Sequence, residues 1–182
     1  MLDQAIEHYK EALKIRRELV EIDENFKPKL ANTLNNLANA YYEKGLLNQA
    51  IEHYKEALKT RRELAEKDES FKPKLANALS NLGVAYRDKG LLDQAIEHYK
   101  EALKTRRELA EKDEKFRLQF TTSLIFLGIA FGTRGTEEDK VSSKKLQTEA
   151  KSMLQDPAVI RSPQYPDLVS LAKILDSLVG KN

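Results

Sequence analysis

The sequence contains no cysteine, which excludes a disulfide framework and thiol chemistry and favours a reducing compartment. It also has little net charge, because 31 basic and 29 acidic side chains leave +2, and the one-sided basic excess of a nucleic-acid binder is missing. The longest apolar run, residues 124–131, is far short of the ~20 residues that cross a bilayer. The chain begins in an amphipathic segment rather than a signal peptide. We therefore expect a soluble, cytoplasmic protein that does not bind nucleic acid.

The motifs of catalysis are missing too. There is no Gly-rich phosphate loop, no metal-ligand spacing and no cysteine nucleophile. The three histidines, His8, His53 and His98, occupy one recurring position. Neighbouring copies should lie about one helix diameter, ~10 Å, apart, too far to share a metal ion at bond lengths of ~2 Å. We expect no enzymatic activity, no cofactor and no metal site.

What the sequence does contain is an internal repeat. Three copies of Leu-(Asp/Asn)-Gln-Ala-Ile-Glu-His-Tyr-Lys-Glu-Ala-Leu-Lys begin at Leu2, Leu47 and Leu92, a period of 45 residues. Apolar residues recur within each copy at steps of three and four, which predicts an amphipathic helix. A second helical segment lies between copies and ends at a glycine, Gly45 or Gly90, that can take the left-handed conformation.

These segments carry a recognisable signature. Leu79, Leu82, Gly83 and Tyr86, followed by Ala95, Tyr99 and Ala102, resemble the tetratricopeptide pattern W-x2-L-G-x2-Y…A-x3-F, with Leu for Trp and Tyr for Phe. The preceding copy has Leu34, Leu37, Ala38, Tyr41, Ala50, Tyr54 and Ala57 in the same frame. The resemblance covers about three quarters of the chain. It implies an all-α fold, a right-handed superhelical array of antiparallel helix pairs.

Each unit is longer than the family's repeat of about 34 residues by about eleven. Eleven residues are about three turns at about 3.6 residues per turn, so an insertion of this size keeps the helix faces in phase. The proline that ends the short motif should then move from Arg62 to Pro73, where a proline stands. We predict that the second helix of each unit is three turns longer than usual, and that the first helix runs from about Pro73 to Lys89.

Two further stretches are more specific. Residues 35–41 (Asn-Asn-Leu-Ala-Asn-Ala-Tyr) and 57–64 (Ala-Leu-Lys-Thr-Arg-Arg-Glu-Leu) are similar to the extended repeats of kinesin light chains. That resemblance implies a protein-binding adaptor. Bacterial kinesin-light-chain-like proteins accompany bacterial tubulins, so it also implies a tubulin-type filament as a partner.

Residues 1–135 are expected to hold the extended repeats, starting on a second helix with no first helix to cover it. Its stripe over Leu2–Leu13 should be partly bare, which predicts a homodimer or swapped contact there. Residues 136–182 are expected to form a degenerate repeat and helical cap. An acidic start at Thr136–Asp139 should open a helix to about Leu154, and Asp167–Val179 should form a final amphipathic helix.

By the family resemblance, the first helices line a concave groove that binds peptides or partner helices. The candidate groove residues are Asn32, Asn35, Asn36, Asn39 and Tyr42 in one unit and Asn77, Ser80, Asn81, Val84 and Arg87 in the next. An asparagine amide both donates and accepts, so it can hold a peptide backbone. Asn36 and Asn81 suit that role and suit hydrogen bonds between repeats equally well. The carboxylate-clamp subclass is excluded, since Asn35, Asn77 and Phe126 stand where it needs a basic residue.

In the third unit the groove positions become apolar, as Thr122, Ile125, Phe126 and Ile129. An apolar patch of this kind is normally covered. The Asp167–Val179 helix or a partner could cover it, and we favour the chain's own helix.

The remaining candidate is a ladder of arginine pairs on the outer surface: Arg16, Arg17, Arg61, Arg62, Arg106 and Arg107. Acidic neighbours such as Glu63 and Glu66 favour a solvated charged face. The functional alternative is docking to an acidic surface, a tubulin-like filament or an anionic lipid, which salt would weaken. Self-assembly through the N-terminal helix and peripheral attachment to acidic membranes therefore stay open as alternatives to the adaptor.

Overall fold

The computed structural model describes residues 1–180. The chain divides into two compact units, Met1–Leu91 (unit 1) and the part from Leu92 onward (unit 2). All regular structure in the described residues is helical, with no strand, which confirms the predicted all-α class.

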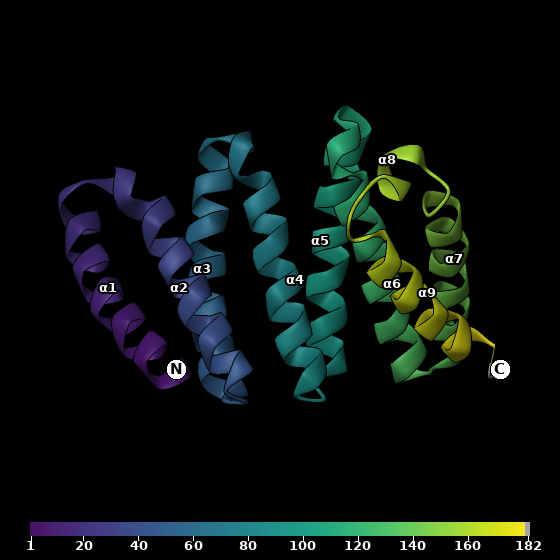
Figure 1. The fold of residues 1–182 in the computed structure, drawn as a ribbon, viewed down its shortest axis with the longest axis horizontal. Helices are drawn as coiled ribbons and strands as arrows, with labels where there is room; N and C mark the ends of the chain where they lie inside the picture. Colours follow the sequence, from purple (N-terminus) through teal and green to yellow (C-terminus); the bar gives the residue numbers. More distant parts are fainter. Residues whose placement is uncertain (181–182) are drawn as a thin grey trace. The chain divides into compact units, whose positions relative to one another are not determined.

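Unit 1 is built from four long helices, in which α1 and α3 are second-type and α2 and α4 first-type helices of the repeat. They are α1 (Leu2–Ile22), α2 (Lys27–Glu43), α3 (Leu47–Lys67) and α4 (Lys72–Asp88), with short 3-10 turns η1 (Glu24–Phe26) and η2 (Glu69–Phe71). Consecutive helices pack on one another in antiparallel order (Figure 1). Leu34, Leu37, Ala38 and Leu79 are fully buried between them, so the repeat motif forms the core.

A capped turn, rather than extra helix, uses part of the added length. Asp68 leaves the helix with an extended backbone (φ −149°), and its side chain accepts a hydrogen bond from the Ser70 amide at 2.8 Å. The prediction that α3 gains three turns is therefore wrong. Beyond Arg62, helix α3 continues only through Glu63–Lys67, which is about one and a half turns. The η2 turn then connects α3 to α4, which begins next to Pro73.

The other connection is a glycine turn. Gly45 and Gly90 have φ of 78° and 81°, a left-handed conformation that other residues adopt at a steric cost. The predicted helix ends at these glycines are confirmed, with α2 and α4 stopping two residues before them.

Unit 2 contains the third repeat and the C-terminal segment. Its elements are α5 (Leu92–Lys112), η3 (Glu114–Phe116), α6 (Arg117–Arg134), α7 (Glu137–Met153), α8 (Pro157–Ile160) and α9 (Tyr165–Val179). Helix α6 lies at the centre and packs on α5, α7, α8 and α9 (Figure 1). The predicted helices after Thr136 and over Asp167–Val179 are confirmed, whereas the short α8 was not predicted.

Helix α9 packs closely on α6. A Cβ added at Gly128 would lie 2.9 Å from Leu175 Cδ2, and one added at Gly132 would lie 3.0 Å from Leu178 Cβ. The small residue at position 128 therefore allows close contact with α9. Ile125 and Ile129 are buried, in agreement with the prediction that α9 packs over this end of the chain.

The stretch Glu114–Arg134 is long and apolar enough, by length and composition alone, to cross a membrane. Half of that window is buried inside the protein, as expected of the central helix of a helical core.

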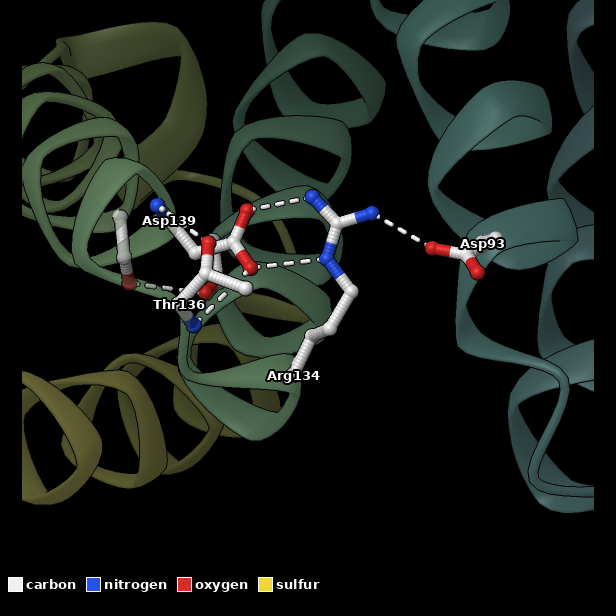
Figure 2. A network of polar contacts seen from close by, with 6 residues as sticks. Asp93, Arg134, Thr136 and Asp139 are labelled. Carbon is white, nitrogen blue, oxygen red and sulfur yellow. Dashed lines mark hydrogen bonds and ion pairs between the residues drawn. The ribbon is translucent and has the colours of Figure 1, made fainter.

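The α6–α7 turn is fixed by an ion-pair network (Figure 2). Arg134 donates to the two oxygens of Asp139 at 2.7 and 2.5 Å and to Asp93 of α5 at 2.6 Å. Asp139, only 1% exposed, also forms a capping box with Thr136. The hydrogen bonds from Arg134, and to a smaller extent those with Thr136, lower the pKa of Asp139 to about 2, although burial alone would raise it.

Replacing Asp139 with Asn should destabilise unit 2 by about 1–3 kcal/mol at pH 7, because it removes the charge that pairs with Arg134. The native pKa of Asp139 lies below the unfolded value of ~3.9. Its contribution is therefore present above about pH 4 and is lost as the pH falls toward 2. Urea unfolding at several pH values should show less acid sensitivity in Asp139→Asn than in the original chain.

Asp93→Asn is the matched control, because it removes the other, exposed carboxylate of Arg134. We expect it to cost less than about 1 kcal/mol. An equal loss from both variants, or unchanged acid sensitivity in Asp139→Asn, would contradict this account.

Candidate functional site

The candidate groove of unit 1 is the face shared by α2 and α4. Asn81 Nδ2 of α4 donates to Asn35 Oδ1 of α2 at 3.1 Å, and Tyr42 of α2 donates to Asp88 at the end of α4. The two first-type helices are thus joined by side-chain hydrogen bonds. Asn81 takes the inter-repeat role, one of the two roles that the sequence left open.

Two other asparagines of α2 bind its hairpin partner α3. Asn39 Oδ1 accepts a hydrogen bond from the Tyr54 hydroxyl at 2.5 Å, and Asn32 Oδ1 accepts one from Arg61 Nη2 at 3.1 Å. Burial raises the pKa of Tyr54 to about 12, so this phenol stays a neutral donor. Both amide oxygens are therefore used within the protein.

Fewer of the predicted side chains are exposed on this face than the sequence indicated. Asn36 and Asn77 are exposed and Val84 is half-buried. Ser80 is only 7% exposed, so its assignment to the groove is wrong: it lies on the buried stripe of α4.

A polar cluster closes one end of this face. Arg87 Nε donates to Asp88 at 2.8 Å, and the same carboxylate accepts from Tyr42. The hydrogen bond to Asp88 raises the pKa of Tyr42, and burial raises it further. Tyr42 and Arg87 remain half-exposed, so a partner could reach them beside Asp88.

The basic ladder needs a larger correction. Arg61 and Arg106 are each only 6% exposed, and Arg16 is half-buried, donating to the Lys29 carbonyl at 2.7 Å. Arg106 donates to Ser123 Oγ at 2.7 Å, and burial lowers its pKa to about 10. The first arginine of each pair therefore points toward a first-type helix.

The second arginines, Arg17, Arg62 and Arg107, are exposed, but at least two of them face acidic partners. Arg17 Nη2 lies 2.8 Å from both oxygens of Glu56. Arg107 bonds Glu149 at 2.6 and 3.0 Å. The outer surface therefore offers less free positive charge than the sequence indicated.

A hollow on the outer side of unit 1 was not predicted. It encloses about 430 Å³ between α1, α2 and α3, and Lys10, Lys14 and Arg17 line one side of it. Its floor includes Tyr41 and His53, whose rings stack at 5.4 Å with 5° between their planes. Burial lowers the pKa of His53. The spacing of the three cations at 10, 14 and 17 on one helix face was the available signal.

A second hollow, about 490 Å³, lies at the α2–α3 turn beside Lys89. In the other copies the equivalent cation binds an aspartate, as Lys44 binds Asp3 and Arg134 binds Asp93. Asn48 replaces that aspartate here. Within residues 1–180, Lys89 consequently has no carboxylate partner.

No group of three potential metal-ligating side chains gathers anywhere in the described part of the chain. His8 is exposed, whereas His53 and His98 are half-buried.

The hydrogen bond between α2 and α4 separates structural from recognition asparagines. Asn81→Ala should destabilise unit 1 by about 0.5–1.5 kcal/mol, because it removes the Asn35 contact. Asn36 follows Asn35 in the chain but is exposed, so Asn36→Ala should change the free energy of unfolding by less than about 0.5 kcal/mol. Urea unfolding of both variants checks this, and a larger loss in Asn36→Ala would reverse the assignment.

Comparison with known proteins agrees with the repeat architecture. A tetratricopeptide-repeat family model matches residues 1–63 and 29–108. The crystal structure of BtubC (BKLC) from P. vanneervenii is similar to the chain, with a TM-score of 0.67 and 20% sequence identity. The match covers 98% of this chain and 72% of that one. No curated protein sequence matches significantly.

Proposed function

Because the chain belongs to the tetratricopeptide repeat family, we propose that it is a non-catalytic adaptor whose α2–α4 face binds an extended segment of a protein partner. Proteins of this family typically act as interaction modules, and helical repeat surfaces of this kind suit extended ligands. The contact would centre on Asn36, which is exposed on this face.

The observation that carries it is the contrast between Asn36 and its neighbours. Asn35 and Asn39, on either side of Asn36 along α2, are committed to Asn81 and Tyr54. Asn36 is exposed, with no hydrogen bond to its side chain among residues 1–180. An amide that can donate and accept at once is suited to a peptide backbone.

We propose further that the partner is a bacterial tubulin-type filament. The support is the kinesin-light-chain-like sequence of residues 35–41 and 57–64, together with the likeness in fold to BtubC, a kinesin-light-chain-like bacterial protein. A cytoplasmic location accords with this proposal.

The α2–α4 face is a better candidate than the arginine ladder. Arg61 and Arg106 are buried, and Arg17 and Arg107 are neutralised by Glu56 and Glu149. Exposed ion pairs contribute little and are screened by salt. Binding through the face should accordingly depend weakly on ionic strength.

Co-sedimentation with a polymerised bacterial tubulin tests the proposal. Asn36→Ala should weaken binding about fivefold, since a lost hydrogen bond to a backbone is worth about 1 kcal/mol. Asn48→Ala is the matched control, because Asn48 is an exposed asparagine away from this face.

Three results would overturn parts of this picture. No pelleting with the filament would exclude that partner. Loss of binding in Arg62→Glu, together with unchanged binding in Asn36→Ala, would favour docking through the arginine ladder. Flotation with anionic liposomes that disappears at high salt would instead support the membrane-linker alternative.

A further inference from the structure

Helix α1 has an apolar face that no other helix of unit 1 covers. In α3 the equivalent stripe packs on α2, and Ala50, Ala57 and Leu64 are at most 9% exposed. Their counterparts in α1 (Ala5, Ala12 and Leu19) are each only half-buried.

The same face carries two isoleucines that the other copies lack. Ile15 stands where they have Thr60 and Thr105, and Ile22 where they have Lys67 and Lys112. Ile15 is 55% and Ile22 82% exposed. Since the second and third copies are almost identical to each other, the fold of a second-type helix does not require isoleucine at either place. The two side chains add apolar surface where the helix is bare.

The stripe has the spacing of a helix–helix seam. Its residues, at alternating steps of three and four, are Ala5, His8, Ala12, Ile15, Leu19 and Ile22. None is acidic, lysine or arginine. The helix is about 31 Å long at ~1.5 Å per residue, so the seam extends over most of its length.

We propose that this face is a homodimer interface, in which two copies pack α1 against α1 in antiparallel orientation. A two-fold axis midway between positions 13 and 14 sets Ala5 opposite Ile22, Ala12 opposite Ile15 and His8 opposite Leu19 of the second copy. Small residues then face large ones at the alanine positions, which lets the side chains of two helices interdigitate. The two-fold makes every pair occur twice and closes the assembly at two copies.

This interface differs from the Leu2–Leu13 stripe that the sequence indicated. Ile6 and Leu13 of that stripe are 4% and 5% exposed, because they pack inside unit 1. The surface that is free lies further round the helix and extends to Ile22. It also lies apart from Asn36 and Asn77, so its test is independent of the proposed adaptor function.

Ile15→Thr with Ile22→Lys restores the residues of the other copies, and the fold tolerates them there. Sedimentation equilibrium of the full chain should show a monomer–dimer equilibrium. The double variant should weaken it at least about 100-fold, because four isoleucine side chains per dimer lose their burial. Circular dichroism should be unchanged. Leu46→Thr, at another partly exposed leucine of unit 1, is the control and should dimerise normally.

Disulfide trapping fixes the register, since the chain has no cysteine of its own. Ala12→Cys and Ile15→Cys chains should form a covalent dimer when mixed and oxidised, and form much less when each is oxidised alone. Efficient trapping of Ile15→Cys alone would indicate a parallel pair and overturn the arrangement.

A chain that stays monomeric at millimolar concentration, or a dimer that the double variant leaves intact, would overturn the interface itself. Open-ended growth beyond dimers would also contradict the closed two-fold. A monomer that binds a synthetic peptide of residues 24–45 at this face would show that the stripe takes a first-type helix instead.

Discussion

The structure depends on one packing constraint: an inner second-type helix must bury two faces at once. Helix α3 meets it by packing between α2 and α4, and its residues Ala50, Tyr54 and Leu58 are nearly inaccessible. Small side chains allow that double contact, because helices approach closely only where little projects between them.

The buried arginines show how tightly the constraint acts. Arg61 and Arg106 lie on the same apolar stripe as Ala57 and Leu64, or their equivalents, and so the packing carries the guanidinium inside. A buried charge is costly unless it is hydrogen-bonded. Asn32 and Ser123 supply bonds from the facing helices. Polar side chains that resemble a binding surface in the sequence therefore serve partly to solvate a charge in the interior.

Most of the fold could be predicted from the sequence, because the repeat imposes a 45-residue period and helical spacing identifies the buried face. The C-terminal helices were also predictable, from the acidic start at Thr136 and the apolar face of α9. The length of α3 was not, since an eleven-residue insertion keeps the helix phase whether it is all helix or helix plus a capped turn. Asp68 was the residue that could have distinguished the two.

The candidate site was less predictable than the fold. The helix face of each asparagine follows from its spacing, but its hydrogen-bond partner depends on the side chain that another helix presents. Asn35 and Asn36 are adjacent in sequence, yet one binds Asn81 and the other is exposed. For the arginines the available signal was position: Arg61 lies three residues before Leu64 and four after Ala57. That spacing places it on the apolar stripe and, by itself, indicates burial.

Near-identical copies of the repeat can differ in surface chemistry by a single functional group. Lys44 and Arg134 each meet an aspartate at the start of a second-type helix, whereas Asn48 leaves Lys89 beside a hollow. The change from Asp to Asn hardly alters shape, so the packing of the repeat is kept while one cation is released from its pair. At Ile15 and Ile22 two substitutions likewise turn a polar edge into an apolar one without disturbing the buried stripe. A repeat fold thus separates the residues that set its packing from those that set its contacts, and in this chain the second set is small.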